Sequence, residues 1–289
     1  MSKKKILIIG YGFVGQNIYK KLDKNLFDVT VLSPHIEDKP EIGFVRAKLQ
    51  DLSSIKDLDL ENIIIVHTAH VGYPLHDQDT LYREVEENLS PFLLLLDLAK
   101  DKKNCRIIYI SSGGAIYGKP QQLPVTENHP LQPISFYGLC KKYMEEALHL
   151  YSIQYNIEYD IVRPSNIYDF NWKTGKKQGL ISALVKSIEE KEAFYLWGDG
   201  SAKKDYIHVE CFSEAIMQIA TTQASNSVFN VSANKSYSTK EIISIVEKKY
   251  GQKINIIQKE VKNQDISEIR LDNTKIKNHI QYNLRTDIF

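Results

Sequence analysis

Apolar residues in the first half of the chain form short runs of Ile, Val and Leu, separated by longer stretches in which they recur every three or four positions. The short runs predict strands and the longer stretches predict helices. Strands are expected at residues 5–9, 28–32, 44–47, 63–68, 106–111 and 159–163, and helices at 16–22, 80–101 and 136–155. This pattern predicts an α/β fold in which helices cover both faces of a parallel sheet.

The second half of the chain has a weaker pattern. A stretch rich in Gly and Lys at 173–179 predicts a surface loop that leads into a second lobe. Strands are expected at 194–197 and 206–209, and Ser238 followed by Glu241 predicts a helix that begins with a capping box. In the first half, Pro91 is expected to kink the helix at 80–101, because proline lacks the N–H that a helix interior uses.

Charge and composition exclude several classes of protein. The 289 residues include 37 basic and 36 acidic side chains without long blocks of one sign, so we expect no nucleic-acid or membrane partner. Apolar residues make up 43% and charged residues 25%, which is close to the globular average. Three widely spaced cysteines without a Cys-x-x-Cys pair indicate reduced structural thiols, and we expect no metal site.

The amino terminus does not fit a secretion signal. Three lysines precede an apolar run at 6–9 that glycines soon interrupt, whereas a secretory segment needs about 7 to 15 apolar residues. Elsewhere no run approaches the roughly 20 apolar residues of a membrane span. We therefore expect a cytoplasmic protein.

A glycine-rich turn lies between the first predicted strand and the first predicted helix. Gly10, Gly12 and Gly15 have the spacing of a dinucleotide-binding loop, in which the helix N-terminus faces the pyrophosphate. The second predicted strand leads to Ser33 and His35, where an acidic residue usually binds the adenosine ribose. Because a carboxylate would repel a 2′-phosphate and Ser33 would not, the sequence favours NADP(H), with NAD(H) as the alternative.

A tyrosine and a lysine lie four residues apart in the predicted helix at 136–155. This spacing puts Tyr137 and Lys141 on one helix face. A free phenol titrates near pH ~10, so it needs a nearby cation to act as an acid or base at neutral pH. The pair follows the strand that ends at Ser111, which predicts a place at the carboxyl edge of the sheet, where such folds bind ligands.

Together, these motifs resemble the extended short-chain dehydrogenase/reductase family, in its nucleotide-sugar epimerase, dehydratase and ketoreductase branch. The resemblance covers nearly the whole chain. It rests on the glycine loop at 10–15, Asp51 and Leu52, Ser-Ser-Gly-Gly-Ala-Ile-Tyr-Gly at 111–118, Tyr-Gly-Leu-Cys-Lys at 137–141, Arg-Pro-Ser-Asn-Ile-Tyr at 163–168, Trp-Gly-Asp-Gly-Ser at 197–201 and Lys-Asp-Tyr-Ile-His-Val at 204–209.

The resemblance implies a Rossmann-type sheet with a smaller C-terminal lobe that holds a nucleoside diphosphate, and a homodimer. We place the cofactor domain at 1–165, with roughly 205–230 added to it, and the lobe at 166–204 and 231–289. By the same resemblance Tyr137 exchanges a proton with the sugar, Lys141 also holds the nicotinamide ribose, and Asn166 faces the substrate. The expected cofactor-binding residues are Gly10, Gly12, Phe13, Val14, Gly15, Ser33, Asp51, Leu52, Ala69, Tyr137, Lys141 and Pro164.

This sequence departs from the family pattern at three places. Ile9 stands at the first glycine of the family's loop. Gly113 aligns with the Ser or Thr that normally assists the tyrosine, so we expect Ser112 to take that role and to touch the substrate. Lys204 replaces an arginine and can still neutralise a diphosphate without bidentate geometry. Arg270 is a second candidate for the diphosphate, and a solvated surface charge is its alternative.

Three functions remain open at this point. We favour an NADPH-dependent reductase that acts at C4 of an NDP-4-keto-6-deoxyhexose in sugar biosynthesis for surface polysaccharides. An NAD-dependent NDP-hexose 4-epimerase is the alternative, and a non-catalytic cofactor-binding sensor is an alternative of another class. A dehydratase is disfavoured because Gly114 and Ala115 stand where that branch has Asp and Glu. His67, His70 and His208 lack metal-ligand spacing and are interpreted as structural.

Overall fold

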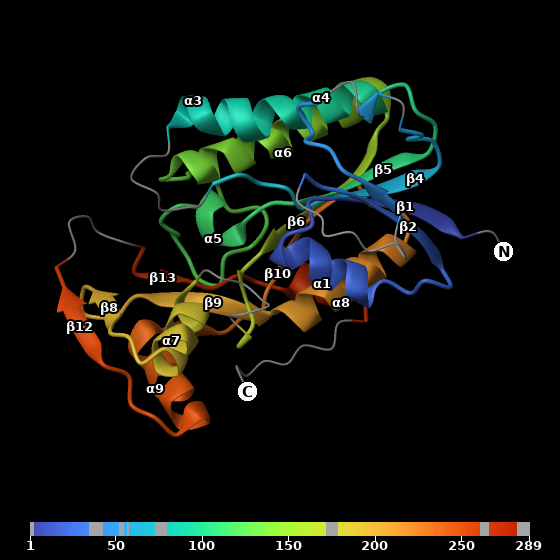
Figure 1. Cartoon of the computed structure of the whole chain (residues 1–289). Coiled ribbons are helices and arrows are strands. Elements are labelled where there is room, and N and C mark those ends of the chain that lie inside the picture. Colours follow the sequence, from blue (N-terminus) through green and yellow to red (C-terminus); the bar gives the residue numbers. More distant parts are fainter. Residues whose placement is uncertain are drawn as a thin grey trace.

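The computed structural model describes residues 3–34, 43–51, 55–56, 58–72, 80–171, 179–260 and 266–281, and these contain a seven-stranded sheet (Figure 1). Its strand order is β10-β6-β5-β4-β1-β2-β3, and every neighbouring pair is parallel. The predicted fold class is therefore confirmed. The strands are β1 (Lys4–Ile9), β2 (Phe27–Leu32), β3 (Gly43–Val45), β4 (Ile63–His67), β5 (Cys105–Ile110), β6 (Glu158–Pro164) and β10 (Ser227–Val231).

Helices cover both faces of this sheet. On one face lie α1 (Phe13–Lys21) and α8 (Val209–Thr221), and on the other lie α4 (Ser90–Ala99) and α6 (Phe136–Tyr155) (Figure 1). Each strand sends alternate side chains to the two cores: Ile6 and Ile8 pack on the α1 and α8 side, whereas Leu7 and Ile9 pack on the α4 and α6 side. Ile9, which replaces the family's first loop glycine, is thus a core residue.

The helix predicted at 80–101 is irregular, but its irregularity precedes Pro91. It consists of α3 (Leu81–Glu84), a π-helical turn η1 (Val85–Leu89) and α4. A proline ring clashes with the carbonyl four residues earlier, here Glu87, and a wider turn relieves that clash. The interruption of the helix is therefore a π turn just before Pro91, the residue at which the sequence predicts a kink.

A second, smaller sheet lies beyond the carboxyl edge of the large one. Among the described residues, β9 (Lys203–His208) pairs with β7 (Asn166–Tyr168), β11 (Ser236–Ser238) and β13 (Glu268–Ile269). The helices α7 (Leu180–Glu189) and α9 (Thr239–Tyr250) share an apolar core with this sheet, and α9 begins with the predicted capping box. The remaining elements are α5 (Gly113–Ile116), α10 (Thr274–His279), β8 (Phe194–Trp197) and its partner β12 (Ile256–Lys259).

Several elements of the second half were not predicted from the pattern. These are α7, α8, α9 beyond its start, α10 and the strands β7, β10, β11, β12 and β13. The loop predicted at 173–179 lies outside the described residues except for Gly179. No helix in the described ranges is long and apolar enough to cross a membrane.

Candidate active site

The glycine loop joins β1 to α1 at the carboxyl edge of the sheet. Gly10 has φ +96°, and a Cβ there would lie 2.8 Å from backbone atoms of Ala69. A Cβ on Gly15 would lie 2.0 Å from the Gly10 carbonyl oxygen. Side chains at these two positions would displace backbone, so the tight packing of strand, turn and helix requires glycine.

The N-terminus of α1 is open, unlike the interior of the loop. Gly12 is its N-cap, without a side-chain hydrogen bond, and a Cβ on Gly12 would have nothing within 4 Å. The first turn of α1, which begins with Phe13 and Val14, carries no acidic residue. Because the first N–H groups of a helix have no intrahelical partner, this end suits a phosphate group. These residues fit the pyrophosphate of a dinucleotide cofactor.

Tyr137 and Lys141 lie on the buried face of α6, with Lys141 3% exposed. Lys141 Nζ lies 5.7 Å from the centre of the Tyr137 ring and donates a hydrogen bond to the Ile110 carbonyl oxygen at 3.0 Å. Burial lowers the pKa of Lys141 to about 8. Burial also raises the pKa of Tyr137 to about 12, opposed by a side-chain hydrogen bond with Ser112. At neutral pH this pair is therefore an ammonium group beside a protonated phenol.

The hydroxyl group beside Tyr137 is that of Ser112, the N-cap residue of α5. Gly113 cannot be replaced by Ser or Thr without movement, because a Cβ there would lie 2.3 Å from Leu271 Cδ1 and 3.1 Å from the Pro164 carbonyl oxygen. A side chain at position 113, where the family has its Ser or Thr, would therefore collide with Leu271 and with the backbone at Pro164. This geometry supports the predicted role of Ser112, which stays a prediction.

The segment that follows β4 brings the glycine loop and Tyr137 to the same edge. Thr68 Oγ1 donates to the carbonyl oxygens of Ile9 and Gly10 at 3.0 and 2.9 Å, and Ala69 lies against Gly10. One residue later, the His70 ring contacts the Tyr137 ring edge to face, with centroids 4.7 Å apart. Three consecutive residues thus link the phosphate loop to the proposed catalytic pair.

The other predicted cofactor residues are spread along this edge. Ser33 follows β2 and is buried, and its N–H donates to the Val45 carbonyl oxygen at 3.1 Å. Asp51 is exposed, and Leu52 lies outside the described residues, as does His35. Pro164 ends β6, where its carbonyl lies against Gly113.

Apart from Ser112, the predicted substrate residues lie in the small sheet or directly beside it. Asn166, in β7, donates to the Asp205 carbonyl oxygen at 2.9 Å, and its amide lies within 4 Å of the position of a Cβ on Gly114. Lys204 lies in β9 and Arg270 directly follows β13. Arg270 Nε is buried and has no hydrogen-bond partner within the described part of the chain, as expected for a donor that awaits an anion.

Two features near the site were not predicted from the sequence. One is Glu84, a 3%-exposed carboxylate 3.2 Å from His70. The other is the ion pair of Arg163 with Glu145 of α6 at 2.6 Å, since the family resemblance marked Arg163 only as a motif residue. Glu84 contacts Cys140 of α6 through its backbone carbonyl, but 56 residues separate the two, so no sequence spacing indicated the contact.

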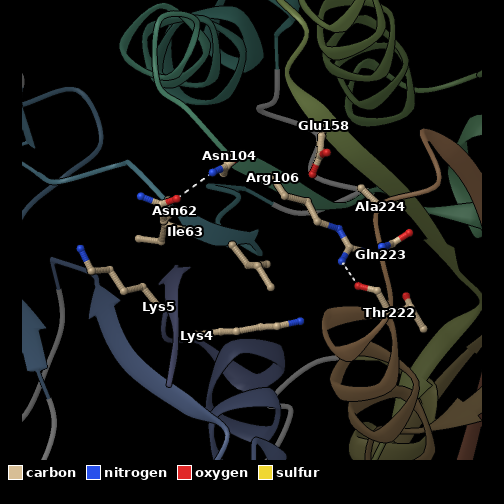
Figure 2. Close-up of a pocket in the computed structure, with 11 residues that line it drawn as sticks. Lys4, Lys5, Asn62, Ile63, Asn104, Arg106, Glu158, Thr222, Gln223 and Ala224 are labelled. Atoms are coloured by element: carbon tan, nitrogen blue, oxygen red, sulfur yellow. Dashed lines mark hydrogen bonds between the residues drawn. The ribbon is translucent and has the colours of Figure 1, made fainter. Parts of the chain in front are cut away.

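A separate pocket of about 490 Å³ lies at the opposite edge of the sheet (Figure 2). Its walls include Lys4, Asn104 and Glu158, which lie at or just before the amino ends of β1, β5 and β6. Arg106 also lines it, but its guanidinium is already bonded to Asp160 and to backbone carbonyls of α8. In parallel sheets ligands bind at the carboxyl ends of strands, so this pocket is not the candidate site.

A phosphate loop and a buried Tyr–Lys pair at the carboxyl edge of a doubly wound sheet define a dinucleotide-dependent enzyme of the Rossmann class. The chain belongs to the NAD dependent epimerase/dehydratase family, whose sequence profile matches residues 6–232. This confirms the branch that the motifs predicted.

Known relatives include both epimerases and a reductase. The chain is 29% identical to the "Putative UDP-glucose 4-epimerase" of Methanocaldococcus jannaschii, over 91% of this chain and 88% of that protein. It is 25% identical to the dTDP-4-dehydro-6-deoxyglucose reductase of Escherichia coli, over 87% of this chain and 83% of that protein. Its fold matches the UDP-glucose 4-epimerase of Thermus thermophilus, with a TM-score of 0.82, 22% identity and coverage of 97% and 94% of the two chains.

Proposed function

We propose that this enzyme transfers hydride at C4 of the sugar of a nucleotide-sugar, with Tyr137 exchanging the proton. The observation that carries the proposal is the cluster of Tyr137, Ser112 and Lys141 on the same sheet edge as the glycine loop. A nicotinamide cofactor supplies or accepts the hydride when it is bound. Gly12 and the N-terminus of α1 would hold its pyrophosphate, and Lys141 would hold its ribose.

The finer proposal is an NADPH-dependent reductase of an NDP-4-keto-6-deoxyhexose. A pKa of about 12 keeps Tyr137 protonated at neutral pH, which suits donation of a proton to a carbonyl oxygen as that oxygen gains negative charge. The Ser112 hydroxyl is placed to hold the same oxygen. Ser33 in place of a carboxylate supports NADP(H), because it would not repel a 2′-phosphate.

The second candidate is an NAD-dependent 4-epimerase. Its specific support is the likeness to proteins named UDP-glucose 4-epimerase along more than four-fifths of each chain. In this reaction Tyr137 would first accept the proton of the sugar hydroxyl and later return it. The same residues would serve both activities, so cofactor turnover is what separates the two candidates.

We further propose that the part of the chain with the small sheet binds the nucleoside diphosphate. Arg270 supplies a buried donor and Lys204 a positive charge for the two phosphates. Asn166 lies near Gly114, within reach of the α5 turn that carries Ser112. In this proposal the diphosphate and the sugar lie on the lobe side of the sheet edge, opposite the cofactor loop. The domain limits given above remain part of this proposal.

The outer face of α6 supports the proposed homodimer. Exposed apolar side chains recur at heptad spacing at Phe136, Tyr143 and Leu150, and Ile153 extends the row. Exposed apolar side chains in a row on one helix are typical of an association surface. Because α4 lies beside α6, a second copy could pair these helices across a two-fold axis (Figure 1).

The deciding experiment is turnover by the purified protein with NADPH or NADH and an NDP-4-keto-6-deoxyhexose, followed by the absorbance of reduced nicotinamide. Stoichiometric consumption of NADPH would establish the reductase. Interconversion of UDP-hexose epimers with tightly bound NAD and no net consumption would establish the epimerase instead. Turnover of neither substrate, together with cofactor binding, would support the sensor and contradict the proposed function. Tyr137→Phe serves as the matched control for background reduction.

A further inference from the structure

A buried chain of polar side chains runs from the backbone after β4 to the proposed catalytic tyrosine. Asn88 fixes its far end by accepting from the Val71 N–H at 2.7 Å and donating to the Val71 carbonyl oxygen at 2.9 Å. The same amide donates to Glu84 Oε2 at 3.0 Å, and this oxygen lies 3.2 Å from His70 Nε2. The His70 ring in turn contacts Tyr137.

This chain is buried enough for its charges to act strongly on one another. The side chains of His70 and Glu84 are 10% and 3% exposed. Burial opposes ionisation of Glu84, but contacts from His70, Asn88 and Cys140 outweigh it and hold its pKa below the ordinary value. Glu84 is therefore a carboxylate at neutral pH. A buried carboxylate needs a neighbouring positive charge, and His70 is placed to supply it when it is protonated.

The charge on Glu84 reaches Tyr137. After burial, which is the main cause, the negative charge of Glu84 adds to the rise of the pKa of Tyr137, while the hydrogen bond with Ser112 opposes it. His70 contacts both Glu84 and the Tyr137 ring, so an imidazolium there would cancel much of that effect. The described titratable groups around the two rings are Lys141 and Cys140 on α6, Glu84 on α3, Tyr109 on β5 and His67 on β4.

His67 cannot take the place of His70 in this arrangement. Burial, with the positive charges of Lys141 and His70, lowers its pKa to about 3, so it is neutral. Its ring packs against Phe92 and Tyr109 at 5.0 and 5.8 Å. The interpretation of His67 as structural agrees with these contacts, whereas the contact of His70 with the buried carboxylate of Glu84 calls for a different account of His70.

We propose that His70 is a positioning residue that neutralises Glu84 beside Tyr137 and so sets the pH range in which Tyr137 exchanges its proton. The inference rests on the proposed function for its kinetic consequence only. The charge coupling of the pair is a property of the fold and can be measured without turnover.

The kinetic test compares His70→Gln, Glu84→Gln and the double variant in the sugar-oxidation direction, where Tyr137 accepts the proton. With Glu84 uncompensated, His70→Gln should lower kcat near neutral pH about tenfold, as a one-unit change in the pKa of Tyr137 would. The pH–rate profile should move to higher pH with little change in KM. Adding Glu84→Gln removes the uncompensated negative charge of Glu84 and should restore most of the lost rate.

His149→Gln is the matched control, because His149 also lies on an edge-to-face contact with a tyrosine, Tyr159, far along α6. It should leave the profile unchanged. A double variant no faster than His70→Gln, or a His70→Gln profile like that of the wild type, would overturn the inference and leave His70 as packing.

Histidine NMR separates this inference from the proposed function. The His70 ring resonance, identified by its absence in His70→Gln, should titrate at lower pH in Glu84→Gln than in the wild type. An unchanged titration would refute the pairing even if the enzyme turns over nucleotide-sugars. If no nucleotide-sugar is turned over, the proposed function fails, and the shift of this resonance still decides whether the pair is coupled.

Discussion

Two successive turns on the buried face of α6, a reactive end at Lys141 and a saturated end at Glu145, treat buried charge in opposite ways. At one end, Lys141 has a single hydrogen-bond acceptor among the described residues, the Ile110 carbonyl, and lies beside Tyr137. One turn further on, Glu145 accepts three hydrogen bonds from Arg163 Nε and Nη2, and Arg163 Nη1 donates to the Tyr117 hydroxyl and the Glu127 carbonyl.

The difference shows how one helix can be both scaffold and reactive surface. Each of the three nitrogens of Arg163 has an acceptor, so its pKa stays far above neutral pH despite burial, because its partners outweigh the desolvation. Lys141 lacks such partners, so burial lowers its pKa to about 8. A cation with unused donors can bind a cofactor ribose, whereas a saturated one can only hold the structure. The saturated end keeps the reactive end in place.

The largest effect on the reactive end should come from Tyr137→Phe. This change removes the phenolic proton and keeps the ring that packs against His70. Because positioned acid–base groups contribute roughly 10²- to 10⁴-fold, kcat should fall by that order. Steady-state rates with nucleotide-sugar measure it, and nicotinamide binding followed by fluorescence should stay within about twofold. A variant with near wild-type kcat would remove Tyr137 from the mechanism.

At the saturated end, Glu145→Ala should act on stability first. It leaves the buried Arg163 without its carboxylate, which costs about 3 to 5 kcal/mol of unfolding free energy. Urea denaturation measures the loss. Glu146→Ala, which breaks only the exposed contact with Lys142, is the control and should cost less than about 1 kcal/mol. Equal losses of unfolding free energy in the two variants would show that burial of the Arg163–Glu145 pair does not increase its contribution to stability.

The pH dependence of the unfolding free energy should reveal the lowered pKa of Lys141. Below pH about 8 the folded protein carries a desolvated ammonium on Lys141, so Lys141→Met should be more stable than the wild type by up to about 3 kcal/mol. Between pH about 8 and 10.5 the native lysine has lost its proton and the unfolded one has not, so wild-type stability rises with pH and this difference disappears. Denaturation at a series of pH values checks it, and a pH-independent difference would contradict a lowered pKa.

The outer face of α6 should give the smallest effect on folding. Leu150→Glu combined with Ile153→Glu places charges in the exposed row and should change the unfolding free energy of the protomer by less than about 0.5 kcal/mol per site. If the proposed homodimer uses this face, sedimentation velocity should show monomers. Leu26→Glu, at an exposed position before β2, should keep the wild-type assembly. A double variant that still sediments as a dimer would place the interface elsewhere.

Sequence reasoning worked best where a motif lies on consecutive or helically spaced residues. The glycine loop and the Tyr137–Lys141 pair were both predicted from spacing, since each depends on one local element. The role predicted for Ser112 came from the alignment of Gly113 with the family's usual Ser or Thr. The structure adds a steric reason, because a Cβ at position 113 would collide with Leu271. The strands β1, β4 and β5 were found because both of their faces are apolar.

Other features depend on contacts between distant segments, and no local pattern encodes them. The His70–Glu84 pair forms because α3 lies beside α6 at the end of β4. No pattern in the sequence around either residue therefore predicts the other. Strand β10 is five residues long, with Asn230 as its fourth residue bonded to Tyr117, and lacks the long apolar run of the central strands. Its place beside β6 follows from the path of α8 across the sheet.

The path of the chain through α8 limits where the protein can be cut into separately folding fragments. The chain leaves the large sheet after β6, builds β7 to β9, and returns through α8 to add β10 as the outermost strand. A fragment that stops at residue 165 would expose the hydrogen-bonding edge of β6 and uncover the core under α8, so it should aggregate when expressed alone. Lobes could be exchanged between relatives only as an insertion between β6 and β9 together with the segment after β10, because a single fusion point would separate α8 and β10 from the sheet they complete.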